Sequence, residues 1–247
     1  MNVSGFARLA GSVSEAQVTD AAAALQRRHP ALRAVVADRV GSAQFAIPEE
    51  PAPIPVGWKE TAEPDAWIGT ALAAGRTPFD VREGPLARVD VLAHPAGEWS
   101  DVVVTAHHVM ADGRSIVTML RELALLCAGE HLAENPSGVR AMPHIVASRG
   151  VVRPLLGVAT RQLRLWPQLR RFPLADIRPQ EMPVDADVIG RRVCAEGTTA
   201  RLRQRARIER TTVYGALAAA SILSLCELHD LVDRSVRIRS PIDIRDL

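Results

Sequence analysis

The residues best suited to chemistry in this chain gather at positions 107–113, whose sequence is HHVMADG. Histidine is the side chain whose intrinsic pKa lies closest to neutrality, so His108 is a candidate general base. Asp112 follows four residues later, close enough to fold back under the loop, and Gly113 would allow a tight turn. We expect no metal site, because adjacent strand residues such as His107 and His108 point to opposite faces. Spacing alone leaves open whether the pair is catalytic or a partly exposed loop end.

The segments on either side of these residues predict a strand and a helix that would position them. Residues 101–106 are apolar enough for a buried strand, whose end would push His108 out of the sheet into a cleft. Residues 114–128 predict a helix, since apolar side chains recur on one face. These are Ile116, Met119, Leu120, Leu123 and Leu126.

Elsewhere strands and helices are mixed irregularly, which predicts an α/β or α+β layered fold. The expected strands are 3–10, 32–36, 43–47, 86–92, 188–194 and 236–239. Four more helices are expected. The first begins after Ser12 or Ser14 and ends near Arg28, and the second covers 65–74. The third runs from a cap at Thr198 or Thr199 to Arg207, and the fourth covers 213–228. Residues 48–57 hold four prolines and predict a loop, and helix 213–228 is apolar enough to be buried on most sides.

Composition narrows the class of protein. The 247 residues are 47% hydrophobic and carry a net charge of +2, which fits a globular protein and gives no sign of a nucleic-acid partner. Cys127, Cys194 and Cys226 are odd in number and lack a CxxC spacing, so neither a disulfide framework nor a zinc site is expected. Without a membrane-length apolar run or a secretory signal, the sequence predicts a cytoplasmic location with no transmembrane segment.

Residues 107–113 resemble the HHxxxDG signature of the superfamily of condensation domains, chloramphenicol acetyltransferase relatives and mycobacterial polyketide-associated acyltransferases. Three further stretches resemble the same superfamily in the same order, namely 25–33, 78–88 and 241–245. The Ala-Asp-Gly within the motif and the segment 211–228 look most like the polyketide-associated branch.

This resemblance implies a chloramphenicol-acetyltransferase-like sandwich of two similar subdomains. The first subdomain would be complete at 1–135, a linker would cover 136–190, and 191–247 would be only the start of the second. A fragment, one part of a split enzyme, and a natural truncation all remain open as explanations of this organisation.

The resemblance also implies an activity, the transfer of an acyl group from a thioester to an acceptor hydroxyl or amine. The donor would be coenzyme A or a carrier-protein phosphopantetheine, with no tightly bound cofactor, no metal and no covalent acyl-enzyme. His108 would be the general base, with His107 as an orienting group and Gly113 shaping the turn. Asp112 would be structural, in an ion pair with an arginine. The candidates for this partner are Arg28, Arg33 and Arg245.

The expected partners are an acyl carrier protein or acyl-CoA, a small-molecule or lipid acceptor, and a second chain that completes the fold. One alternative is a peptide-bond-forming condensation domain of a nonribosomal peptide synthetase. Another is a non-catalytic truncated homologue that binds a carrier protein or a partner chain. The arginines between 149 and 178 are interpreted as a solvated linker face in preference to a membrane-surface helix or a docking face.

Overall fold

The computed structural model describes residues 1–39, 42–133, 194–231, 234 and 236. The chain divides into two compact units, residues 1–140 and residues 141–247, and each is considered by itself.

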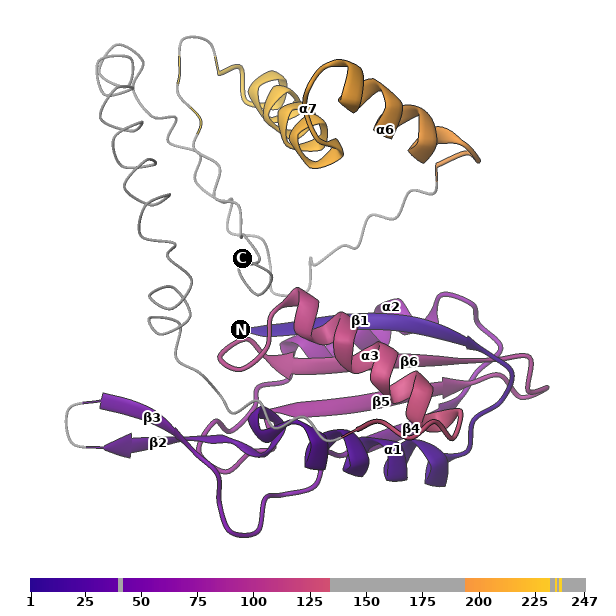
Figure 1. The fold of residues 1–247 in the computed structure, drawn as a ribbon, viewed down its shortest axis with the longest axis vertical. Coiled ribbons are helices and arrows are strands. Elements are labelled where there is room, and N and C mark those ends of the chain that lie inside the picture. The colour runs from indigo at the N-terminus through magenta and orange to yellow at the C-terminus, as the bar shows by residue number, and fades with distance from the viewer. Residues whose placement is uncertain (40–41, 134–193, 232–233, 235, 237–247) are drawn as a thin grey trace. The chain divides into compact units, whose positions relative to one another are not determined.

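A four-stranded sheet in the order β1-β6-β5-β4 forms the centre of the first unit (Figure 1). β1 (Asn2–Ala10) and β5 (Ala87–Ala93) both pair antiparallel with β6 (Trp99–His107), which is therefore an interior strand. β4 (Val56–Glu60) lies parallel to β5 at the edge of the sheet. The predicted strands 3–10, 86–92 and 101–106 are confirmed within a residue or two.

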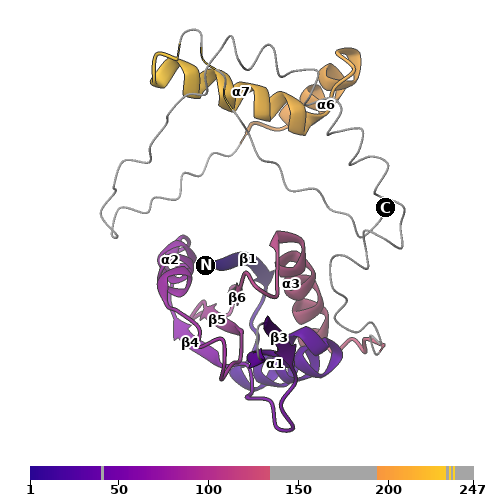
Figure 2. The same cartoon turned by 90° about the vertical axis from the view of Figure 1, so that its left-hand side faces the viewer.

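Helices cover both faces of this sheet (Figure 2). α1 (Glu15–Arg28) and α3 (Gly113–Cys127) pack on one face, and α2 (Ala66–Arg76) packs on the other. Because both faces are covered, β6 is buried continuously from Ser100 to Ala106. The core under α1 and α3 is built from alternate strand residues, including Val89, Val91, Val102, Val104 and Ala106.

The helix ends follow local sequence rules. Ser14 caps α1 in a reciprocal capping box with Gln17, as one of the two predicted caps. Pro30 then starts a 3-10 turn, η1 (Pro30–Arg33), because proline fits the first position of a helical turn. The strand predicted over 32–36 is therefore wrong in its first half.

Two further differences from the predicted elements lie in the connecting segments. β2 (Val35–Arg39) and β3 (Ser42–Ala46) pair antiparallel as a two-stranded sheet, and β2 begins later than predicted. β4 was missed, since its first two residues fall in the predicted loop and its pairing with β5 is non-local.

On the α2 face, an ion pair between the exposed Arg8 and the buried Asp101 ties β1 to β6 and to the segment entering α2. Arg8 Nε donates to Asp101 Oδ1 at 2.6 Å, and Arg8 Nη2 donates to Asp101 Oδ2 at 2.7 Å. The same Nη2 also donates to the carbonyl of Pro64 at 2.6 Å. The hydrogen bond to Asp101 raises the pKa of Arg8, so the guanidinium stays charged.

The described part of the second unit consists of α6 (Thr198–Ile208) and α7 (Val213–Leu228). Both helices are confirmed, but Gly197, at φ 75°, takes the position before α6, so neither Thr198 nor Thr199 is its cap. The expected burial of α7 is wrong for the described residues, because none of its side chains is buried and α6 is the described element that packs against it.

Several expectations concern positions that the structure does not describe. These are the linker 136–190, the arginine-rich stretch 149–178, most of the strand 188–194, the strand 236–239 with the exception of Val236, and Arg245.

In the described residues no single helix has the length and apolar character of a membrane span, although α6 and α7, bent by 93°, pass that test as a pair.

Candidate functional site

The two histidines lie where β6 ends. His107 is the last strand residue, paired with Asn2 of β1, and its N–H donates to the carbonyl of Leu86 at 2.9 Å. The backbone of His107 is thus held on one side by β1 and on the other by the residue just before β5, and the chain leaves the sheet at His108.

Backbone hydrogen bonds fold residues 108–111 into a compact turn. The His108 N–H donates to the carbonyl of Met1 at 2.9 Å, and the N–H groups of Met110 and Ala111 both donate to the carbonyl of His107, at 3.1 and 3.3 Å. Ala111 is buried in the core and anchors the end of the turn. The turn leaves the side chain of His108 exposed, and none of the described residues hydrogen-bonds its imidazole.

The side chain of His107 faces inward and is held by the turn itself. Its Nδ1 accepts a hydrogen bond from the Val109 N–H at 3.2 Å, and its ring meets the Phe79 ring edge-to-face, with centroids 6.4 Å apart. Burial, the positive amino terminus and His108 together lower the pKa of His107. The neutral imidazole can accept at Nδ1, so the pKa and the hydrogen bond agree.

Asp112 is the N-cap of α3. Its Oδ1 accepts hydrogen bonds from the Ser115 N–H at 2.9 Å and from the Ser115 hydroxyl at 2.7 Å. This capping role was not predicted, although an aspartate directly before an apolar helix is a recognised start signal. Gly113 is the first residue of α3, and its backbone is not left-handed. A Cβ there would meet nothing within 4 Å, so the predicted need for glycine to form a tight turn is not supported by the local packing.

The three arginines that were candidates for an ion pair with Asp112 lie in different surroundings. Arg28 pairs with Glu122 of α3, at 3.2 Å between its Nε and Glu122 Oε2. Arg33 has a buried Nε with no hydrogen-bond partner among the described residues, and Arg245 lies outside them.

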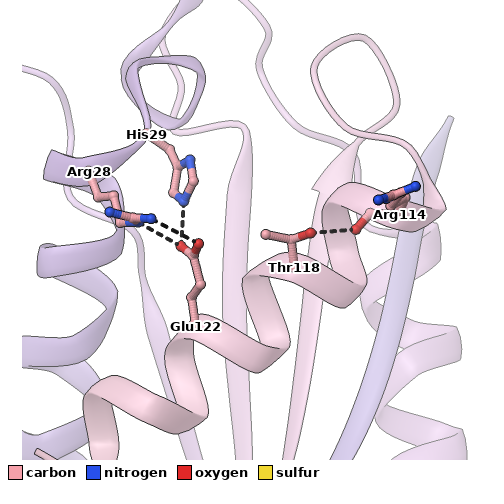
Figure 3. Close-up of polar contacts among 5 residues, drawn as sticks. All are labelled: Arg28, His29, Arg114, Thr118 and Glu122. Atoms are coloured by element: carbon pink, nitrogen blue, oxygen red, sulfur yellow. Dashed lines mark hydrogen bonds and ion pairs between the residues drawn. The ribbon is translucent and has the colours of Figure 1, made fainter. Parts of the chain in front are cut away.

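Glu122 joins the end of α1 to the middle of α3 (Figure 3). Its Oε2 also lies 2.5 Å from Nε2 of His29, so two consecutive residues of the α1 exit contact one carboxylate. Burial alone would raise the pKa of Glu122, but the hydrogen bonds from His29 and Arg28 outweigh it and the pKa is lowered. One helical turn before Glu122, the Thr118 hydroxyl donates to the Arg114 carbonyl at 3.0 Å and has no part in this cluster.

A groove of about 670 Å³ lies between α1 and the C-terminal end of α3. Its lining includes Arg27, Arg28, Cys127 and His131 but no residue of the 107–113 motif. The rise of an α-helix puts Leu126, which also lines it, roughly 20 Å along α3 from Asp112. We assign the candidate site to the motif, because the groove lies well away from it and is lined by none of its residues.

Among the described residues no cluster of three His, Cys, Asp or Glu side chains could hold a metal ion. Burial raises the pKa of the Cys127 thiol, which disfavours the nucleophilic thiolate. The chemistry that the described part of the chain supports best is therefore proton transfer at His108.

Comparison with known proteins identifies the first unit. The Condensation domain family matches residues 1–141. CymA of Salinispora arenicola, described as a probable nonribosomal peptide synthetase, is 29% identical over 235 residues. The phosphinothricin tripeptide synthetase PhsC of Streptomyces viridochromogenes is 35% identical over 137 residues. The match to CymA covers 90% of this chain but 3% of CymA, and the match to PhsC covers 52% and 12%.

Solved structures show the same fold at low sequence identity. SgcC5 from Streptomyces globisporus matches with a TM-score of 0.64 and 19% identity, over 93% of this chain and 54% of that one. The condensation domain of the monacolin K polyketide synthase MokA matches with a TM-score of 0.59 and 18% identity, over 92% and 54%. The chain thus spans about half the length of these structures. Given the family match over its first 141 residues, this chain belongs to the condensation-domain family and contains the N-terminal portion of that fold.

Proposed function

We propose that this chain takes part in forming an amide bond, by transferring an acyl group from a carrier-bound thioester to an acceptor amine with His108 as general base. The observation that carries the proposal is the presentation of His108, whose backbone is fixed while its imidazole is exposed. Membership of the condensation-domain family supports the reaction class, acyl transfer from a phosphopantetheine thioester.

The acceptor amine is preferred over a hydroxyl because CymA and PhsC, two of the curated relatives, are described as peptide synthetases. The resemblance to the polyketide-associated branch favours ester formation on a lipid-like or polyketide alcohol, which we keep as the second candidate. Coenzyme A is the alternative donor to the carrier protein.

In the proposed step, the acceptor nitrogen bonds to the thioester carbonyl carbon while His108 takes its proton. Collapse of the tetrahedral adduct breaks the carbon–sulfur bond, and the departing thiolate receives that proton. No acyl group is attached to the protein at any stage. Positioned general bases typically contribute about 10²- to 10⁴-fold to such rates.

The domain organisation belongs to this proposal as well. The N-terminal subdomain at 1–135 supplies the base, and 191–247 begins a second subdomain after a linker at 136–190. A second chain, or further residues of a longer chain, would supply the opposing wall of the site.

The test is acyl transfer from a set of aminoacyl and fatty-acyl thioesters, presented both on a carrier protein and as coenzyme A esters. Amine and alcohol acceptors are compared for the full chain, His108→Ala and His131→Ala, each alone and mixed with a separately expressed C-terminal half of a homologous condensation domain. His131 is exposed and lies at the far end of α3, so His131→Ala is the matched control.

We expect transfer to amines to fall at least a hundredfold in His108→Ala and to stay within twofold in His131→Ala. Undiminished transfer by His108→Ala would overturn the general-base assignment. Transfer to alcohols alone would favour the ester-forming candidate. No transfer under any of these conditions, with carrier binding retained, would favour a non-catalytic homologue.

A further inference from the structure

Beneath the motif, on the α2 face of the sheet, three side chains are stacked in sequence from β5 to the end of β6. The ring of Phe79, in the segment after α2, makes the edge-to-face contact with His107 at an interplanar angle of 88°. The guanidinium carbon of Arg88, on β5, lies 4.0 Å from the centroid of the same ring. Phe79 is thus held between a cation and the first histidine of the motif.

The guanidinium is itself fixed to the backbone at the end of α2. Arg88 Nη2 donates to the carbonyl of Thr77 at 2.7 Å, and that carbonyl also accepts from Asn2 Nδ2 at 2.8 Å. Because Asn2 pairs with His107 in the sheet register, the Thr77 carbonyl links β1, β5 and the exit of α2 at the end of the sheet where the motif begins.

Arg88 occupies a position that is unfavourable for a charged side chain. Burial lowers its pKa, and its Nε is buried without a hydrogen-bond partner among the described residues. Asp90, the nearby acid, has a buried Oδ2 that also lacks a partner there, and burial raises its pKa. Burial thus disfavours the charge of Arg88, and the attraction of Asp90, the bond to the Thr77 carbonyl and the Phe79 ring offset that cost.

We infer that Arg88 and Phe79 are positioning residues for the motif. Arg88 fixes the Phe79 ring, the ring fixes the imidazole of His107, and the Nδ1 of His107 holds the Val109 N–H. That last bond closes the turn that presents His108. The inference rests on the proposed function only in assigning a catalytic consequence, since the order of the turn can be measured by itself.

The structural consequence can be tested by NMR on the full chain, labelled with ¹⁵N. Long-range ¹H–¹⁵N spectra report the tautomer and pKa of His107, and hydrogen exchange reports the protection of the Val109 amide. The variants are Arg88→Met, Phe79→Leu and the conservative Phe79→Tyr. Arg76→Met is the control, because Arg76 is an exposed arginine at the end of α2.

We expect Arg88→Met and Phe79→Leu to raise the pKa of His107 toward its ordinary value and to speed exchange of the Val109 amide at least tenfold. Phe79→Tyr and Arg76→Met should leave both within twofold of the wild type. In the transfer assay, Arg88→Met and Phe79→Leu should lower kcat at least tenfold with KM changed less than threefold. Phe79→Tyr should keep the kcat of the wild type.

Unchanged His107 tautomer and Val109 exchange in a folded Arg88→Met variant would overturn the inference. If that variant does not fold, the test is made on the wild-type chain. Absence of a nuclear Overhauser contact between the Phe79 ring and the His107 ring there would also overturn the inference. Failure of the proposed function would be distinguishable from failure of this inference. In that case His108→Ala would retain acyl transfer, whether or not the Arg88 and Phe79 variants disorder the turn.

Discussion

Within the motif, the histidines and the aspartate have different structural roles. His107 holds the turn through Val109, His108 is left exposed, and Asp112 caps the helix that follows. An exposed base needs a rigid backbone to be presented in one orientation, and here the neighbouring residues provide it. The capping bond of Asp112 satisfies the otherwise unpaired Ser115 N–H in the first turn of α3.

Loss of the Asp112 carboxylate should therefore destabilise α3. We expect Asp112→Ala to lower the free energy of unfolding by about 1 kcal/mol, the usual cost of removing an N-cap. Asp112→Asn should retain most of the stability, because asparagine caps about as well as aspartate. Chemical denaturation checks this, and equal losses in both variants would point to a charge interaction of Asp112 in place of the cap.

Substitution of Gly113, in contrast to loss of the Asp112 carboxylate, should not lower the stability of the protein. Because a Cβ would meet nothing within 4 Å and the backbone is not left-handed, Gly113→Ala should fold with a free energy of unfolding equal to or above that of the wild type. Thermal unfolding monitored by circular dichroism is the measurement. A loss of more than about 1 kcal/mol would show that the start of α3 is strained, as such losses are unusual at open surface positions.

Sequence reasoning found the motif because its residues are contiguous, so their types and spacing can be read directly. The capping role of Asp112 was missed, although an acid placed before an apolar helix is a local signal that could have revealed it. The ion pair between Arg28 and Glu122 could not be read from the sequence, because the two residues are 94 positions apart and only the packing of α1 on α3 brings them together. The contact of Arg88 with Phe79 was missed for a related reason. Both residues lie in the stretch 78–88, which was noted only for its resemblance to the superfamily, and nothing in the sequence shows that the two side chains meet.

Between elements, the main connection of α1 to α3 outside the apolar core is the Glu122 cluster. The carboxylate is largely buried and contacts Arg28 and His29 together, and Arg28 Nη1 has no hydrogen-bond partner among the described residues. Removal of the Glu122 carboxylate leaves the partly buried guanidinium of Arg28 without compensation, which costs more than the loss of a surface pair.

We expect Glu122→Gln to lower the free energy of unfolding by about 1–3 kcal/mol, the usual cost of leaving a hydrogen-bonded polar group without its charged partner. The wild type should also lose stability in acid. The pKa of Glu122 is lowered by folding, so its contribution is present above the ordinary glutamate pKa of about 4.3 and is lost as the pH falls below that value. Denaturation at pH 3 to 7 measures both, and Glu122→Gln should show a smaller pH dependence.

Close packing of α3 on β1 depends on Gly5. A Cβ at this position would overlap Cγ2 of Ile116 and would lie 3.1 Å from Cδ1 of Leu120. We expect Gly5→Ala to cost about 1–3 kcal/mol by overpacking. Gly69→Ala is the control, because Gly69 lies inside α2 with open space around it and alanine favours helix there. Equal stability of the two variants would mean that α3 packs less closely on the sheet.

The elements that were predicted poorly are those whose conformation depends on a distant partner. β4 pairs with β5 some thirty residues later, and its short sequence carries little alternation of its own. The prediction over 32–36 failed only in its first part, because Pro30 starts a helical turn that ends at Arg33, whereas the β-branched Val35 and Val36 do lie in β2. Long amphipathic segments such as α1 and α3 were predicted well, since their periodicity is local.

Across the whole molecule, the described residues of the two units differ in how much they bury. The apolar core made by the sheet, α1 and α3 lies entirely within residues 3–127. In contrast, α7 is apolar around its circumference, a composition typical of a core helix, yet it leaves Tyr214, Leu217, Leu223 and Leu228 exposed. Stability should therefore reside in the first unit.

This difference predicts that residues 1–133 fold without the rest of the chain. The fragment retains every strand of the sheet and the whole core, so it should unfold cooperatively in denaturant and show the near-ultraviolet dichroism of packed Trp58 and Trp99. A fragment ending at residue 118 is the matched control, because it removes Met119, Leu120 and Leu123 from the core and should not fold. The full chain should bind an apolar dye through α7, whereas the 1–133 fragment should not. An unfolded 1–133 fragment would show that the first unit depends on contacts with residues beyond 133, and the sheet with its helices would then not be a self-sufficient scaffold for His108.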